Sequence, residues 1–364
     1  MNNEILAPKT EEIEGLGGDE DAFWIDYPID TLLIRNENRT VHDVLRRIEK
    51  GAFIMDPDFQ RDFIWKDDQQ SKLIESVLMR IPLPVFYLAE DERGRMIVVD
   101  GLQRLSTFKR FVENDLYLKL PERSELDKKR FTDLSPKLQN RVEDCNLVLY
   151  IIDAKVPERA RLDIFERVNS GVPLTRQQMR NSLYMGPATL FLKEEASTEI
   201  FLKATGESLN TRTMRDREFV NRFCAFQILE RKKYKGDMDE FLAEALVTIN
   251  KLESQALKDL SRQFRNGLFN NYEIFQEHAF RKWVIGQTRR SVINASLWDV
   301  MSTGLSIYSK EIVITHGNEL KEAFSDLLKN ELFISAITSG TNDTRKVNCR
   351  FEEAEKKIRE VLGD

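Results

Sequence analysis

The sequence predicts an α+β fold, in which a small mixed sheet with its helices is followed by a mostly helical C-terminal region. Between about Tyr27 and Tyr184, short apolar runs alternate with segments of helical periodicity. Beyond Gly186 the apolar residues recur every three or four positions and glycines are few, which is typical of helices. With 364 residues and 41% hydrophobic content, the chain can bury one large core or two modest ones.

The first elements of the N-terminal region follow from local patterns. The segment VHDVLRRIEKG has one apolar face, with Thr40 placed to cap its start and Gly51 to end it. The next segment, DPDFQRDFIW, is expected to be extended because Pro57 disfavours helix. A helix over SKLIESVLMR then precedes Pro82 and Pro84, which bracket the start of the expected strand VFYLAE.

A strand, a glycine turn and a helix come next. A hairpin through residues 92–94 joins VFYLAE to the expected strand MIVVD, and Gly101 then opens a new helix. An apolar strand, NLVLYIID, follows a further short helix. The segment FERVNSGVPLTRQQMRNSLY closes the region, and Thr175 and Gln178 in it have capping-box spacing.

These patterns divide the chain into three parts. Residues 1–24 form an acidic arm that we expect to be disordered, residues 25–185 form the mixed domain, and residues 186–364 form a helical domain. Helical periodicity is strongest in REFVNRFCAFQILERKK, MDEFLAEALVTINKLES and FEEAEKKIREVL.

Charge is distributed unevenly along the chain. Residues 1–30 hold nine of the 61 acids and one of the 55 basic residues, so the remainder is close to balanced, with 52 acids and 54 bases. Residues 203–235 carry nine bases against four acids, and residues 262–290 carry six against two. Such segments either contact a DNA backbone or form solvated helix faces, and composition leaves both interpretations open.

Other classes of protein find little support. No run of eighteen uncharged apolar residues indicates a membrane span, and the acidic start of the sequence is unlike a signal peptide. The three cysteines are widely spaced and form no CxxC pair, which fits reduced thiols. We therefore expect a cytoplasmic protein without a membrane partner and without a structural metal.

The stretch VVDGLQRLSTF is the first candidate site. A strand that ends in a glycine turn at a helix start presents backbone N–H groups that favour an anion, and Arg104 can add a planar fork of donors. Phosphate suits both. Asp100 is compatible with holding a metal bound to that phosphate, orienting a ribose hydroxyl, or capping the helix. The alternative for the whole turn is an ordinary aspartate-glycine turn that binds nothing.

Two further segments add candidate residues. In DFQRDFIW, an amide, an arginine and an aromatic ring at Gln60, Arg61 and Trp65 suit a base and its phosphates. The alternative is that Trp65 belongs to the core and Arg61 pairs with a neighbouring aspartate. In FERVNSGVPL, the amide of Asn169 either bonds a nucleotide or caps the loop.

Taken together, these motifs resemble a known family. FQRDFIW, KLIESVLMRIPLPVFYL, VVDGLQRLSTF and FERVNSGVPLT stand in the order found in the family called domain of unknown function 262. This is the GmrS-like N-terminal domain of the ParB and sulfiredoxin superfamily. The resemblance covers residues 25–185 and implies a ParB/sulfiredoxin-like sheet with helices, a nucleotide-binding cleft and service in bacterial antiphage defence.

The resemblance assigns roles to individual residues. Asp100 and Gln103 are the candidate catalytic residues, and the expected nucleotide-binding residues are Gln60, Arg61, Trp65, Gly101, Arg104 and Asn169. Leu102 departs from the family signature Asp-Gly-Gln-Gln-Arg, which leads us to expect binding with little or no hydrolysis. The competing interpretation is that Leu102 faces the core. Sulfiredoxins place their catalytic cysteine at the position of Leu102, so their chemistry is excluded.

Two classes of function remain. The first is a regulatory protein of a defence or DNA-restriction system that binds a nucleoside triphosphate and hydrolyses it weakly. Mg²⁺ can accompany the triphosphate, and nucleotide binding is coupled to the engagement of DNA or of a partner. The second is a non-enzymatic DNA- or protein-interaction module with a vestigial cleft. His42, His278 and His316 stand apart, so the sequence predicts no nuclease site of the His-metal type. A separate nuclease or methyltransferase subunit is the expected partner, DNA contact is expected through residues 203–235 and 262–290, and an oligomer is compatible with the sequence.

Overall fold

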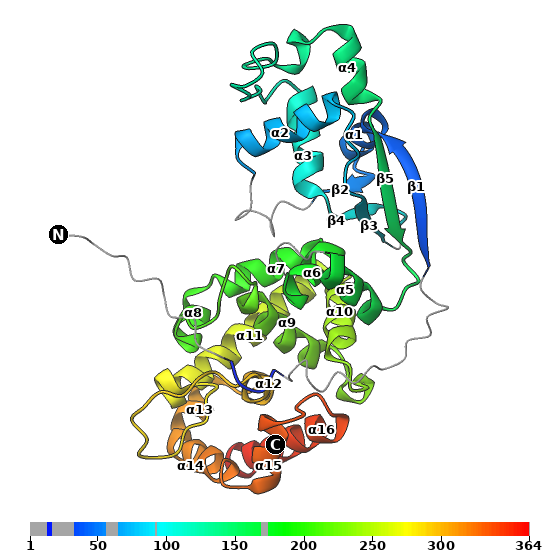
Figure 1. Cartoon of the computed structure of the whole chain (residues 1–364). Coiled ribbons are helices and arrows are strands. Elements are labelled where there is room, and N and C mark those ends of the chain that lie inside the picture. Colours follow the sequence, from blue (N-terminus) through cyan, green and yellow to red (C-terminus); the bar gives the residue numbers. More distant parts are fainter. Residues whose placement is uncertain (1–12, 17–32, 56–64, 92, 169–173, 364) are drawn as a thin grey trace, which may run out of the picture. The chain divides into compact units, whose positions relative to one another are not determined.

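The computed structural model describes residues 13–16, 33–55, 65–91, 93–168 and 174–363 (Figure 1). The chain separates into two compact units, one formed by residues 26–183 and the other by residues 1–25 and 184–364. Each unit has its own hydrophobic core. The first contains a mixed five-stranded sheet with helices, and the second is built of helices. The α+β class predicted from the sequence is therefore confirmed.

The sheet of the N-terminal unit has the strand order β1-β5-β3-β4-β2. The β1–β5 and β3–β4 pairs are antiparallel, whereas the β3–β5 and β2–β4 pairs are parallel. The strands are β1 (Ile34–Thr40), β2 (Phe53–Ile54), β3 (Phe86–Glu90), β4 (Met96–Asp100) and β5 (Asn146–Ile152).

Helices pack against this sheet. The first four, together with one 3₁₀ turn, supply buried apolar side chains to a core shared with Phe86, Leu88 and Leu149 of the strands. Helices α5 and α6 contact β4. The elements are α1 (Val41–Glu49), α2 (Asp67–Leu78), α3 (Leu102–Val112), η3 (Phe131–Asp133), α4 (Pro136–Glu143), α5 (Glu158–Val168) and α6 (Arg176–Leu183).

Two capping motifs predicted from the sequence are confirmed. The Thr40 hydroxyl accepts the Asp43 N–H at 3.2 Å and starts α1. At the start of α6, the Gln178 Oε1 accepts the Thr175 N–H at 2.8 Å, and the Thr175 Oγ1 accepts the Gln178 N–H at 3.2 Å. These reciprocal bonds satisfy amide groups that the helix itself leaves without an acceptor.

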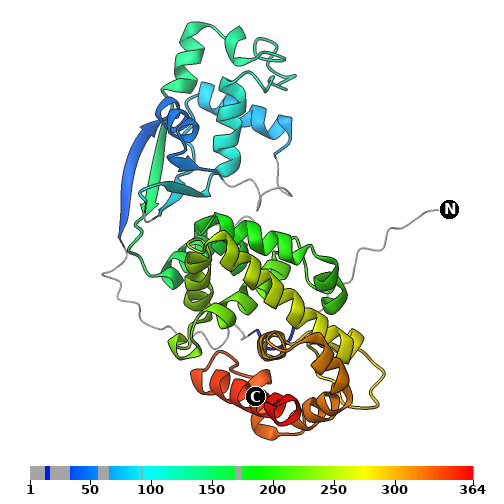
Figure 2. The ribbon, with the colours of Figure 1, turned by 180° about the vertical axis from the view of Figure 1, so that it is seen from behind.

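The C-terminal unit is an assembly of helices, which Figure 2 shows from behind. Its core is rich in aromatic rings, with the fully buried Trp298 in edge contact with Phe219 and Phe201. The elements are α7 (Pro187–Ala196), α8 (Glu199–Thr205), α9 (Arg215–Ile228), η4 (Arg231–Lys233), α10 (Met238–Ile249), α11 (Ser254–Phe275), η5 (Gln276–His278), α12 (Ala295–Gly304), α13 (Lys310–Thr315), α14 (Gly317–Leu327), α15 (Glu331–Thr338) and α16 (Thr344–Leu362).

A buried ionic cluster joins three of these helices. Arg222 of α9 donates two hydrogen bonds to the Asp299 carboxylate on α12, at 2.8 and 2.6 Å. Arg350 of α16 donates a third at 2.9 Å. All three side chains are almost completely excluded from solvent. Removing one partner would strand a buried charge, so the cluster ties the three helices together.

Part of the N-terminal arm packs against the C-terminal unit. The Glu14 N–H donates to the Ile293 carbonyl at 2.9 Å, and the Glu14 carbonyl accepts the Ala295 N–H at 2.8 Å. The Gly15 carbonyl accepts the Thr341 hydroxyl at 2.9 Å. Residues 13–16 fall inside the arm that the sequence predicts to be disordered, and no local pattern indicated this pairing.

The helices in the described part of the chain do not meet the requirements of a membrane span. None of them combines the necessary length with a sufficiently apolar sequence.

Asp216 provides a pH-dependent test of the helical unit. This residue lies in the first turn of α9, is 7% exposed, and has a buried Oδ1 without a hydrogen-bond partner among the described residues. Burial raises the pKa of its carboxyl to about 6, against an opposing effect of Arg217. Folding therefore favours the protonated form, and the resulting stability is present below the ordinary pKa of 3.8 and is lost as the pH rises to about 6.

We expect Asp216→Asn to be more stable than the wild type at pH 7, by roughly 2–3 kcal/mol, because asparagine carries no charge to bury. The difference should disappear near pH 4, where the aspartate is mostly protonated in the folded state. Urea unfolding of both proteins between pH 4 and pH 7 measures this change. A stability difference that does not vary with pH would contradict the assignment.

Candidate functional site

The turn between β4 and α3 requires glycine for two reasons. Gly101 has a φ of +100°, in the left-handed region that other residues enter only with strain. A methyl group on Gly101 would also lie 2.3 Å from Cδ1 of Phe86. The backbone therefore passes directly over the Phe86 ring and leaves no room for a side chain at position 101.

Arg104 occupies the first turn of α3, and its guanidinium is directed into the domain. The side chain is buried and donates to the carbonyl oxygens of Pro84 and Val85, the latter at 3.0 Å. It also donates to Oδ2 of Asp100 at 2.8 Å and lies 4.2 Å from the centre of the Phe86 ring. These contacts engage Arg104 with protein groups and give it a positioning role in the turn.

Asp100, at the end of β4, is held on two sides. Its carboxylate accepts bonds from the Arg104 guanidinium and the Gly101 N–H, and about a third of the side chain is exposed, at 34%. Burial raises the pKa of the carboxyl, while Arg104 and the Gly101 amide act in the opposite direction. These contacts orient the Asp100 carboxylate beside the turn between β4 and α3.

Gln103 joins the turn to a second predicted segment. Its Oε1 accepts the backbone N–H of Trp65 at 3.0 Å. The Trp65 carbonyl in turn accepts the Gln70 amide at 2.6 Å, and Gln70 accepts the Arg110 guanidinium at 2.8 Å. The structure thus brings two residues predicted from separate motifs, Gln103 and Trp65, into direct contact.

Comparison with protein families gives a match that includes this turn. Residues 41–185 match the family described as GmrSD restriction endonuclease, N-terminal domain. Residues 41–185 are thus similar to the N-terminal domain of GmrSD restriction endonucleases, and we call them the GmrSD-like domain. No curated protein and no solved structure matches the chain significantly. The matched range includes Asp100–Arg104, Trp65 and the helices α5 and α6.

Three predicted binding residues lie outside the described residues: Gln60, Arg61 and Asn169. Gln60 and Arg61 precede Trp65 by five and four positions, and Asn169 follows Val168, the last residue of α5. Their roles in the GmrSD-like domain remain predictions.

Leu102 belongs to the core of the GmrSD-like domain. It is 5% exposed and packs in the same cluster as Leu105 and Phe108. The structure thus supports the interpretation that this leucine is the first core-facing residue of α3. A glutamine here would enter an apolar environment instead of facing a phosphate, so the geometry favours the core-packing interpretation of Leu102 over a role for this position in hydrolysis.

Residues outside the predicted set also shape the turn. Phe86 contacts both Gly101 and Arg104, and the carbonyl groups of Pro84 and Val85 accept the Arg104 donors. The sequence indicates a strand at this position but gives no sign that its first residues face a turn about twenty positions later.

Many cations of the two basic segments already have acidic partners. This pairing reduces the open positive surface that the charge counts of residues 203–235 and 262–290 suggest. The ion pairs join Lys203 to Glu199, Arg215 to Glu218, Arg222 to Asp299, Arg231 to Glu355, Lys232 to Glu230, Lys233 to Glu244, Arg262 to Asp259, Arg265 to Glu195 and Lys282 to Glu14.

The described histidines lie in separate environments. His42 is exposed on α1, His278 stacks on Trp283 with 5.4 Å between ring centres, and His316 precedes α14. Among the described residues, no three side chains of the metal-ligating types gather in a way that would hold a metal ion.

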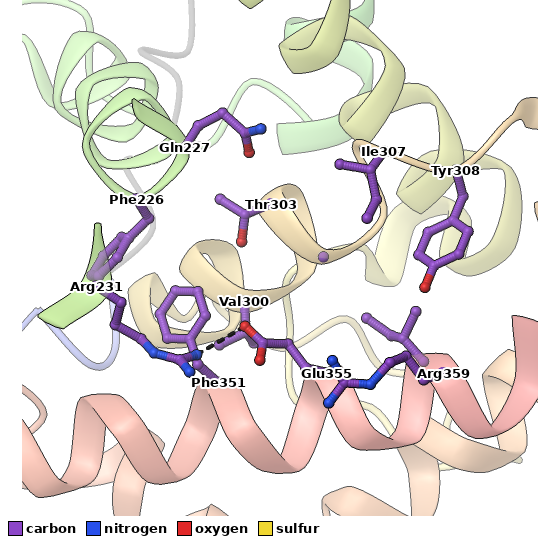
Figure 3. A pocket seen from close by; sticks show the side chains of 12 residues that line it. Phe226, Gln227, Arg231, Val300, Thr303, Ile307, Tyr308, Phe351, Glu355 and Arg359 are labelled. Atoms are coloured by element: carbon purple, nitrogen blue, oxygen red, sulfur yellow. Dashed lines mark hydrogen bonds and ion pairs between the residues drawn. The ribbon is translucent and has the colours of Figure 1, made fainter. Parts of the chain in front are cut away.

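The C-terminal unit contains a pocket of about 600 Å³ between α9, α12 and α16 (Figure 3). Arg231 lies at its edge, paired with Glu355 at 2.8 Å and 5.2 Å from the centre of the Phe351 ring. Tyr308 and Arg359 stand at the other side of the pocket (Figure 3). None of the described residues predicted to bind nucleotide or to act in catalysis lines it.

The contact between Gly101 and Phe86 gives a stability prediction. Gly101→Ala should lower the free energy of unfolding by about 2–4 kcal/mol, because the new methyl group adds a steric clash to backbone strain. Gly94→Ala is the matched control, since Gly94 also has a positive φ, of +75°, but a methyl group there would meet only Glu90 at 3.9 Å. Denaturant unfolding of both variants is the measurement, and equal losses would show that the Phe86 contact contributes nothing.

Leu102→Gln should destabilise the domain by about 2–3 kcal/mol, because it replaces buried apolar area with an amide that lacks partners. Leu102→Met keeps the apolar character and should cost less than about 1.5 kcal/mol. Melting temperature and phosphate release from nucleoside triphosphates are measured for both variants. A glutamine variant as stable as the wild type and faster in phosphate release would restore a catalytic role for this position.

Proposed function

We propose that this protein works in a restriction-type defence system and that its GmrSD-like domain binds a nucleoside triphosphate at the Asp100–Arg104 turn. The family match supports the restriction-type context. The observation that carries the nucleotide site is the bond between Gln103 and the Trp65 N–H. It fastens the segment that follows Gln60 and Arg61 in the sequence to the helix start where backbone amides favour an anion.

In this proposal, backbone amides and side chains of the turn have different roles in nucleotide binding. The first amide to bond back within α3 is that of Leu105, to the Gly101 carbonyl at 2.9 Å, so the amides of the preceding turn lack an acceptor within the helix. These amides and Arg61 bind phosphate. Arg104 acts indirectly, because its donors hold Asp100 and the start of β3. Asp100 ligates the Mg²⁺ that accompanies the nucleotide or orients a ribose hydroxyl.

The bound nucleotide then biases engagement of DNA or of a partner protein. The sequence predicts no nuclease site of the His-metal type, so DNA cleavage is assigned to a separate nuclease subunit. The chain acts as its nucleotide-responsive regulator, with slow turnover of the bound triphosphate.

The proposal predicts that Arg61→Ala weakens nucleotide binding by about ten- to a hundred-fold, because a charge-assisted contact to phosphate is lost. Its melting temperature should equal that of the wild type. Titration of fluorescent adenine and guanine nucleotides in excess Mg²⁺ provides the dissociation constants. Arg93→Ala is the control, since Arg93 is exposed in the β3–β4 hairpin and has no ion pair among the described residues. Wild-type protein that binds neither nucleotide at millimolar concentration sinks the proposal.

A second function is favoured by a specific observation. Arg104 is engaged with Pro84, Val85 and Asp100, and Leu102 is buried, so two side chains of the turn are turned away from a ligand. This arrangement fits an interaction module whose nucleotide cleft is vestigial. Binding of DNA or a partner that is indifferent to added nucleotide would favour this module over the regulator.

A further inference from the structure

A pocket of about 500 Å³ lies between the end of α2 and the helix α4 of the GmrSD-like domain. None of the described residues of the predicted nucleotide site lines it. Three cationic side chains and one carboxylate line it, which leaves an excess of positive charge. The polar lining residues are Arg80, Lys137, Asn140, Arg141, Asp144 and Asn146.

Arg80 has a backbone conformation that glycine adopts more easily than other residues. Its φ of +61° is left-handed, and it ends α2 with two characteristic bonds, from the Arg80 N–H to the Val77 carbonyl and from the Ile81 N–H to the Ser76 carbonyl, both 2.9 Å. Glycine is the usual residue at this point of a helix end because other residues are strained there. Helix termination therefore does not account for the arginine.

The cationic side chains that line this pocket have N–H donors without acceptors among the described residues. Among the described residues, Arg80 and Lys137 make no ion pair and no side-chain hydrogen bond. Arg141 donates to the Leu78 carbonyl at 2.9 Å, and its Nε is buried without a hydrogen-bond partner in the described part of the chain. Arg123, by contrast, is paired with Glu75 of α2 at 2.9 Å. The pocket thus concentrates unneutralised donors.

We propose that this pocket binds a phosphodiester group of a DNA backbone. Guanidinium and ammonium groups are the usual phosphate ligands of proteins, and they fix position without reading sequence. The volume falls in the range of pockets that hold organic ligands and exceeds what a lone phosphate needs. Ile81, 47% exposed, and Pro82 give the rim apolar surface for a sugar. The choice of DNA rests on the proposed restriction-type function.

The decisive variant is Arg80→Gly, which removes the guanidinium and also relieves the backbone. Its melting temperature should equal or exceed that of the wild type. Its affinity for a mixed-sequence DNA duplex at low salt should fall by about tenfold, and the slope of log affinity against log salt should shrink by roughly 0.9, as expected for one lost phosphate contact. Lys137→Gln should weaken binding in the same way. Fluorescence anisotropy measures both quantities.

Lys128→Gly is the matched control. Lys128 is also an exposed cation with a φ of +61°, lies in the same domain and does not line the pocket. It should leave duplex affinity unchanged. An equal loss in this control would reduce the effect to net charge and overturn the site, as would a stable Arg80→Gly protein with wild-type affinity and salt slope.

Two further titrations separate the sources of phosphate. Inorganic phosphate and a nucleoside triphosphate are each added to wild type and Arg80→Gly. Nucleotide affinity that is lost in Arg80→Gly while duplex affinity is kept would assign the pocket to a free nucleotide and overturn the DNA assignment. Duplex binding that depends on Arg80 in a protein that binds no nucleotide supports this site and removes the nucleotide role alone.

Discussion

The packing of β4 and α3 in the GmrSD-like domain depends on the ring of Phe86. The backbone of Gly101 passes over it, and the Arg104 guanidinium lies 4.2 Å from its centre while bonding to Pro84, Val85 and Asp100. These contacts join β3, β4 and α3 into one packed corner. The orientation of Asp100 follows directly from this corner, because its partners Arg104 and the Gly101 amide cannot move without breaking several buried contacts.

Sequence patterns predict the elements that carry strong local signals. Thr40 caps α1, and Thr175 and Gln178 form the expected capping box, because these bonds depend on neighbours three residues apart. The strand β1 was not predicted. Its sequence, IRNENRT, is polar, and its strand conformation comes from pairing with β5 and from ion pairs such as Arg35 with Glu90, 55 residues away. Such distant partners leave no trace in a local window.

In the candidate site too, local features could be predicted from the sequence and contacts between distant residues could not. A strand followed by glycine and a helix predicts the turn at Gly101, and the apolar spacing to Leu105 already allows Leu102 to be a core residue. The direction of Arg104 could not be predicted, because its acceptors lie on carbonyl groups about twenty residues earlier. Likewise, the number of basic residues near Arg231 does not reveal that Arg231 pairs with Glu355, which lies 124 residues away in the sequence.

Asp299 ties together three helices that translation delivers at different times. Its carboxylate receives Arg222 of α9, 77 residues before it, and Arg350 of α16, 51 residues after it. On the ribosome, the nascent chain can form the first pair well before the second arginine has emerged. The C-terminal unit therefore completes this buried ionic cluster only after α16 has been synthesised, and until then the Asp299 carboxylate lacks one of its two cationic partners.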